Sequence, residues 1–394
     1  MQFLKNSRRW HNVFGGARGL GGAGGAGGAG GAGGAGGAGG AAGAGGAGGA
    51  GGGSGDNGLD AGGALISRDA IVGATDDDNN IRNDLKLAPL DSTDPLPGWE
   101  PWVRGTVIDA ELAAGLSFGA VNDDGTARAK PTVATRGYQL RWGDSDASAR
   151  KPVATLYRPK LVNRASMRTQ VNKVLEYADL REDRMGEILS QIPQLGTYWT
   201  SIAGLHPSRT RWTLELLAAT TRLAILVEMR FKHAFAFPRP VQLSPQVQPP
   251  IQTPSHSAYP SGHSTEAHCA ARVLMAVMKQ GDQSPIGTML LRQAGRIAIN
   301  RTVAGVHFPI DSRAGQVLGT SLAEYIVSRG SSGKFRHRIF DAENYLQQDF
   351  QAPALDPVDA NANGTLGLTV ADPAGATTSA TVAWLWDKAQ GEWP

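Results

Sequence analysis

Three segments in the second half of the chain carry residues that could bind and transform an anion. They are Lys232–Pro240 (KHAFAFPRP), Pro260–His263 (PSGH) and Asn300–Asp311 (NRTVAGVHFPID). The glycine turn of the second segment stands directly before an apolar helical pattern. Backbone N–H groups and the positive end of the helix dipole make such a turn a ready anion site. A histidine placed there can transfer a proton near neutral pH.

Together the three segments supply the groups that a tetrahedral dianion requires. Guanidinium and ammonium groups match its oxygens, and a hydroxyl with a backbone N–H can complete the contact. Each residue taken alone also fits a solvated helix end or a hydrogen-bonded loop histidine. The shared order and the consistent chemistry therefore carry the prediction. The candidate residues are Lys232, Arg239, Ser261, Gly262, His263, Arg301, His307 and Asp311.

The segments resemble the three-part signature of the type 2 phosphatidic acid phosphatase (PAP2) and vanadium-dependent haloperoxidase superfamily. That signature is K-x6-RP, PSGH and SR-x5-H-x3-D. The motifs cover Lys232–Asp311, and the family's helical core would extend from about Met167 to Ser328. Asn300 stands where the pattern has serine. Asparagine also forms hydrogen bonds, so this departure puts little in doubt.

The resemblance implies a role for each matched residue. His307 would be the nucleophile that forms a phosphohistidine, and Asp311 would hold its tautomer through a hydrogen bond. His263 would protonate the leaving oxygen and then activate water. No divalent metal is implied. The equatorial oxygens of the transition state would be bound by Lys232, Arg239, Arg301, Ser261 and Gly262.

The motif residues do not separate the two chemistries of this superfamily. In the peroxidase branch the same pocket would hold vanadate on His307 and oxidise halide with hydrogen peroxide. The short interval between His263 and Arg301 resembles soluble acid phosphatases, and Phe308 stands where peroxidases tend to carry tryptophan. Against this, His256 lies seven residues before His263, as in algal bromoperoxidases, although it equally fits a polar loop residue.

We therefore predict first a metal-independent phosphatase that needs no cofactor and hydrolyses small phosphate monoesters or anhydrides. The alternative is a vanadium-dependent haloperoxidase with vanadate as cofactor and peroxide and halide as substrates. A third hypothesis keeps the pocket as a non-catalytic phosphate-binding module in a protein that acts through its Gly-rich segment.

Composition excludes several other classes of protein. A net charge of +3 gives no reason to expect a nucleic-acid partner, and the single cysteine, Cys269, excludes an internal disulfide. The most apolar run, Leu214–Phe237, contains charged residues throughout, which argues against membrane insertion. The start lacks an apolar signal region, and Ser7–Arg9 only faintly resembles a twin-arginine export signal. We expect a soluble and preferentially cytoplasmic protein, with compartment and oligomeric state left open.

Apolar spacing of the helical type predicts the main elements. The predicted helices are Met167–Ile192, Ser208–Ala234, Glu266–Lys279, Pro285–Thr302 and Ser312–Ser328. We predict an all-α bundle, with at most a few short strands in the N-terminal and C-terminal parts. The GGA repeat over Gly21–Gly53 cannot bury enough surface to order itself. The predicted parts are a disordered tail (1–88), an irregular packed part (89–166), the helical core (167–330) and a C-terminal extension (331–394).

Overall fold

The computed structural model describes residues 86–143, 150–160, 162–193, 195–351 and 368–394. The chain divides into two compact units, Met1–Pro97 and Gly98–Pro394. The described part of the first unit, residues 86–97, consists of turns and the start of the short 3-10 helix Leu96–Gly98. The predicted disordered tail lies outside the described residues up to residue 85. It stays a prediction, as do the boundaries at residues 166 and 330.

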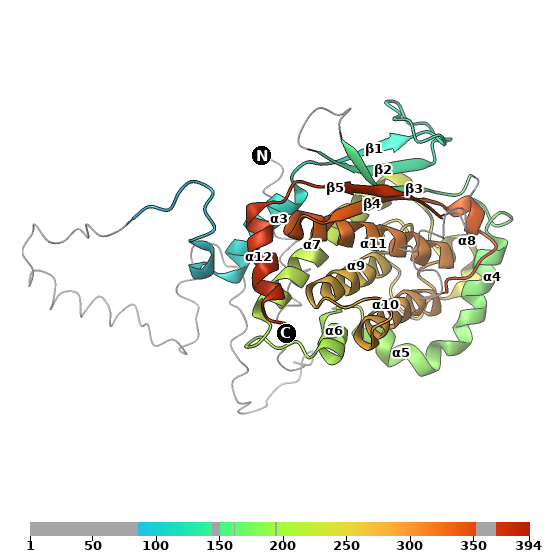
Figure 1. Cartoon of the computed structure of the whole chain (residues 1–394). Helices are drawn as coiled ribbons and strands as arrows, with labels where there is room; N and C mark the ends of the chain where they lie inside the picture. The colour runs from blue at the N-terminus through green and yellow to red at the C-terminus, as the bar shows by residue number, and fades with distance from the viewer. Residues whose placement is uncertain (1–85, 144–149, 161, 194, 352–367) are drawn as a thin grey trace, which may run out of the picture. The chain divides into compact units, whose positions relative to one another are not determined.

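Helices form most of the second unit (Figure 1). The predicted helices of the core are confirmed as α7, α9, α10 and α11, but Met167–Ile192 is divided into α4, the 3-10 helix η5 and α5. Within the described ranges, no helix is both long enough and apolar enough to cross a membrane. The α-helices are α3 (Pro101–Ala113), α4 (Arg168–Glu176), α5 (Arg181–Ser190), α6 (Gly196–Ala203), α7 (Arg211–Phe235), α8 (Pro240–Leu243), α9 (Gly262–Val277), α10 (Pro285–Val303), α11 (Pro309–Ser331) and α12 (Ala380–Gln390), with 3-10 helices η5 (Tyr177–Leu180), η6 (Pro245–Val247) and η7 (Ala342–Tyr345).

A five-stranded mixed sheet lies along one side of these helices, so the prediction of an all-α chain is wrong (Figure 1). The strands are β1 (Leu116–Val121), β2 (Gly137–Trp142), β3 (Lys151–Tyr157), β4 (Lys334–Asp341) and β5 (Leu368–Gly375), in that spatial order. Neighbours are antiparallel except β3 and β4, which are parallel. The sheet therefore joins the segment before the helical core to the segment after it, and β4 and β3 pack on α11.

The alternation of apolar residues does not predict these strands, because several of their buried residues are polar. Arg338 of β4 is fully buried and donates hydrogen bonds to both carboxylate oxygens of Glu324 on α11, at 3.0 and 2.7 Å. Across β2 and β3, buried Gln139 donates to the hydroxyl of Thr155 at 2.7 Å. These side chains satisfy one another inside the fold, which the alternation rule for strands does not anticipate.

Helices α9 and α11 cross at two glycines of α11. A Cβ atom on Gly315 would lie 2.6 Å from the carbonyl oxygen of Ser261, and one on Gly319 would lie 2.3 Å from that of Thr265. Only glycine leaves room for this approach. The close crossing brings the first turn of α9, which begins at the PSGH turn, against the first half of α11.

The sheet also reaches the PSGH turn through Tyr259. This buried residue donates a hydrogen bond from its hydroxyl to the carbonyl oxygen of Tyr157, the last residue of β3, at 3.1 Å. Its ring packs edge-on against Phe235, with centroids 5.2 Å apart, and against Phe237 at 5.6 Å. The residue before Pro260 is thus fixed by the sheet and by the C-terminal end of α7 together.

The Arg338–Glu324 pair gives a stability prediction. Glu324→Gln leaves a buried guanidinium without its charged partner, so we expect the free energy of unfolding to fall by about 3–5 kcal/mol. Chemical denaturation measures the change. Glu187→Gln is the matched control, because Glu187 pairs with the half-exposed Arg296 and should contribute less than about 1 kcal/mol. Equal losses in the two variants would contradict the prediction.

Candidate active site

Lys232 lies near the C-terminal end of α7 and points into the loop before the PSGH turn. It is 1% exposed, and its ammonium donates to the carbonyl oxygens of Ser257 at 3.2 Å, Ala258 at 3.4 Å and Pro260. Burial lowers the pKa of Lys232 to about 8, a shift that the nearby carboxyl of Glu228 opposes. The lysine therefore fixes the turn and brings a positive charge to it.

Arg239 joins the first segment to the third. It precedes α8, and its Nη1 donates to the carbonyl oxygen of Val306 at 2.8 Å and to Nε2 of His307 at 3.0 Å. On its other edge, Nη2 donates to Nδ1 of His256 at 3.1 Å, and Nε donates to the carbonyl oxygen of the same residue at 3.0 Å. One guanidinium therefore contacts two histidines.

His307 and Asp311 form a hydrogen-bonded pair where α11 begins. His307 Nδ1 lies 3.1 Å from Oδ2 of Asp311, and that oxygen also accepts the backbone N–H of Phe308 at 2.9 Å. Since Arg239 can only donate, Nε2 of His307 is the acceptor and the ring proton sits on Nδ1. This tautomer leaves Nε2 unprotonated, with its electron pair hydrogen-bonded to Arg239, and a nucleophile or a metal ligand requires an unprotonated nitrogen.

The PSGH turn is held from α7 and α11. Ser261 is the N-cap of α9, where its hydroxyl accepts the N–H of Ser264 at 3.5 Å, and its own N–H donates to the carbonyl oxygen of Asp311 at 2.9 Å. Gly262 packs directly against Glu228, because a Cβ atom there would lie 2.4 Å from Oε1 of Glu228 and would force that side chain to move. The N-terminal end of the 16-residue helix α9 is thereby aimed at the same region as Lys232.

His263 and Arg301 are joined by Gln191, the C-cap residue of α5. Nε2 of His263 donates to the carbonyl oxygen of Gln191 at 3.1 Å, and Nη2 of Arg301 donates to its side-chain oxygen at 2.9 Å. The same oxygen accepts the amide of Asn300 at 3.3 Å. Asn300, the one departure from the signature, thus supports the arginine beside it rather than the anion site itself.

Burial and the neighbouring cations keep the histidines neutral. Burial and then Arg301 lower the pKa of His263 to about 3, and burial, Lys232 and Arg239 lower that of His256 to about 4. The pKa of His307 lies well below its ordinary value, from burial and from Arg239. A dianion bound among these groups would raise all three pKa values, because it offsets the positive charge.

The structure thus brings all the predicted site residues together. Five of these residues could bind an anion through a positive charge or a hydrogen-bond donor, and they are called the cradle: Lys232, Arg239, Ser261, Gly262 and Arg301.

Comparison with known families adds that residues 212–330 match the model of the PAP2 superfamily. Residues 212–330 belong to the PAP2 superfamily. The predicted resemblance is confirmed, and with it a superfamily of phosphatase or haloperoxidase type. The curated proteins compared with the chain gave no match.

The candidate site contains neighbours that the motifs did not reveal. Gln191 lies at the end of a predicted helix and carries no sequence signal for its contacts with His263 and Arg301. Glu228 did carry a signal, because it is an acidic residue one helical turn before Lys232. Such a residue, 5% exposed in the structure, is rarely buried without a reason.

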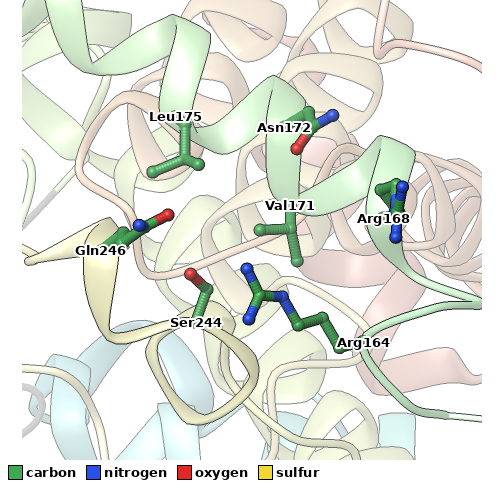
Figure 2. A pocket seen from close by; sticks show the side chains of 7 residues that line it. All are labelled: Arg164, Arg168, Val171, Asn172, Leu175, Ser244 and Gln246. Atoms are coloured by element: carbon green, nitrogen blue, oxygen red, sulfur yellow. The ribbon is translucent and has the colours of Figure 1, made fainter.

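A pocket lies near the end of α8 that is opposite Arg239. Figure 2 shows this pocket of 350 Å³ between α4 and the segment that contains η6. Its polar lining includes Arg164, Arg168, Ser244 and Gln246, and no cradle residue takes part. The pocket is therefore distinct from the anion site, although Arg239 and Ser244 stand at the two ends of the same short helix.

The contact between Gly262 and Glu228 gives a second prediction. Gly262→Ala places a methyl group against a buried carboxyl, so we expect a loss of about 1–3 kcal/mol in the free energy of unfolding. Glu228→Ala in the same chain should recover part of this loss, as a double-mutant cycle would measure. Gly186→Ala is the control, because nothing lies within 4 Å of a Cβ at that helical position. Additive effects of the two substitutions at Gly262 and Glu228 would refute the contact.

Proposed function

We propose that the protein is a phosphatase that hydrolyses small phosphate monoesters or anhydrides through a phosphohistidine, without a divalent metal. The observation that carries this proposal is the environment of His307. Its Nδ1 proton is held by Asp311 at 3.1 Å, and its Nε2 electron pair faces the guanidinium of Arg239 at 3.0 Å. A neutral, oriented imidazole next to a cationic cradle is what in-line attack on a phosphoryl group needs.

The reaction would proceed in two displacements. Nε2 of His307 attacks phosphorus, and the bond from phosphorus to the leaving oxygen breaks as His263 supplies a proton to that oxygen. His263 then accepts a proton from water, whose oxygen attacks phosphorus and breaks the P–N bond, which releases phosphate. Throughout, Lys232, Arg239 and Arg301 would stabilise the negative charge on the equatorial oxygens.

Proton transfer by His263 depends on the bound anion. Burial and the charge of Arg301 lower the pKa of His263 to about 3, so the ring is neutral at physiological pH. A phosphate dianion beside Arg301 would offset the charge that depresses this pKa and favour the protonated ring. Substrate binding would therefore place the catalytic proton on His263.

A second candidate function is a vanadium-dependent haloperoxidase. The observation in its favour is His256, whose Nδ1 lies 3.1 Å from Arg239 and which adds a third histidine to the site. The donor set suits vanadate, because Nε2 of His307 is unprotonated and the cradle would bind its oxygens. A bound vanadate would supply a Lewis acid for the activation of hydrogen peroxide toward halide.

Turnover of p-nitrophenyl phosphate tests the first function. We expect hydrolysis that EDTA does not reduce and that His307→Ala lowers by at least about 10³-fold, since the nucleophile is lost. His233→Ala is the control, because that exposed histidine next to Lys232 takes no part in the scheme. Absence of turnover with and without EDTA would contradict the proposal. Bromination of a phenol by the vanadate-loaded protein, in the same preparation, would favour the second function instead.

The pair of His307 and Asp311 gives a separate prediction. Asp311→Asn presents an amide that can donate to Nδ1, which moves the ring proton to Nε2 and removes the nucleophilic electron pair. We expect kcat to fall by about 10²–10⁴-fold while KM changes little. Steady-state kinetics with p-nitrophenyl phosphate measure both constants, and circular dichroism checks the fold. A variant with unchanged kcat would contradict the role of Asp311.

A further inference from the structure

Glu228 is a buried carboxyl next to the catalytic turn that the reaction scheme does not use. It is 5% exposed and lies one helical turn before Lys232 on α7. Its Oε1 faces the Cα of Gly262, and its Oε2 has no hydrogen-bond partner among the described residues. A carboxylate in such a place loses its hydration without full compensation. A carboxyl in this position is expected to be protonated, to lie near a cation or to take part in the function of the site.

A second carboxyl faces Glu228 from α9. Glu266 lies one turn after Gly262 and is half-buried. Burial, then the charge of Glu266, raise the pKa of Glu228 well above its ordinary value, and burial raises that of Glu266 to about 7. Lys232 on α7 opposes both pKa shifts, and Arg239 in the segment after it opposes that of Glu228. Two carboxyl groups in one buried site do not both ionise readily, so they behave as a pair.

This pair interacts electrostatically with Lys232, and Glu228 also contacts Gly262 of the cradle. Lys232 can neutralise either an anion in the cradle or an ionised carboxyl of the pair. An oxyanion that enters the cradle adds negative charge close to Glu228 and Glu266. That charge makes ionisation of the pair less favourable, so a proton should bind to it from solvent.

We propose that Glu228 and Glu266 are positioning residues that take up a proton when an oxyanion binds, which releases the charge of Lys232 to the anion. The inference rests on the proposed function, because it requires the cradle to bind an oxyanion. It also predicts how the affinity of the site for an oxyanion changes with pH. As pH rises through the range in which the pair ionises, its negative charge competes for Lys232 and repels the ligand, so oxyanion affinity falls.

Calorimetric titration with orthovanadate tests the proton uptake directly. Binding is measured at pH 7 in two buffers of different ionisation enthalpy, which gives the number of protons taken up per vanadate. We expect the wild-type chain to take up about half a proton more than Glu266→Gln, because a group with a pKa near 7 is half ionised there. The protonation of vanadate itself is the same in both titrations and cancels. Glu215→Gln, at the other end of α7 and paired with Arg104, is the control.

The outcomes separate the two proposals. If vanadate binds to the wild-type chain and to Glu266→Gln with the same proton uptake, the carboxyl pair has no such role and the proposed function stands. If vanadate does not bind to the wild-type chain, the anion site itself fails and both proposals fall.

The stability of Glu228→Gln gives an independent measurement. A carboxyl with a raised pKa holds its proton in the folded state at pH values where the unfolded chain has lost it. The stability of the wild-type chain should therefore decline as pH rises above the ordinary glutamate range toward the raised pKa. Glu228→Gln cannot ionise, so its Tm relative to wild type should rise between pH 5 and pH 8. A constant difference in Tm over that range would overturn the buried ionisation of Glu228.

Discussion

The burial of three cationic side chains is the constraint on which the rest of the site depends. Desolvation of such groups is costly unless other groups solvate them. Here backbone carbonyl oxygens take that part: those of Ser257, Ala258 and Pro260 for Lys232, those of Val306 and His256 for Arg239, and that of Ile188 for Arg301. Carbonyl dipoles solvate a cation without cancelling its charge. The charge of these side chains thus stays available to an oxyanion, as the proposed function requires.

Backbone solvation of this kind requires loops that are held rigidly. The loop before the PSGH turn is fixed by Tyr259, which binds the end of β3, and the turn itself by the close crossing of α9 and α11 at Gly315 and Gly319. The sheet that contradicts the all-α prediction thus has a direct part in the site. It positions the carbonyl groups that hold Lys232, and through Arg338 and Glu324 it is tied to α11, the helix that carries Asp311.

The sequence allowed the chemistry to be predicted more fully than the architecture. Motif spacing identified the cradle and its histidines, because each element of that pattern is a specific donor, acceptor or charge. Helical periodicity located α7, α9, α10 and α11. The strands could not be found in the same way, since buried polar residues such as Arg338 and Gln139 hide their alternation. Gln191 could not be predicted either, because a glutamine at a helix end has no pattern that indicates contacts with residues 72 and 110 positions away.

The cradle alone does not select between phosphoryl transfer and halide oxidation. Both need an unprotonated Nε2 on His307, a neighbouring carboxylate that holds the tautomer, and cations around a trigonal-bipyramidal group of oxygens. The two chemistries differ in how long the oxyanion stays in the cradle. Its residence depends on how strongly the cradle binds it and on how readily the site transfers protons to it. Under the proposals made above, the groups that would set these properties lie beside the motif: His256 against Arg239, Gln191 between His263 and Arg301, and Glu228 against Gly262 with Glu266 electrostatically linked to it. The shared signature does not include these neighbours, so they are the residues at which the two chemistries would be distinguished.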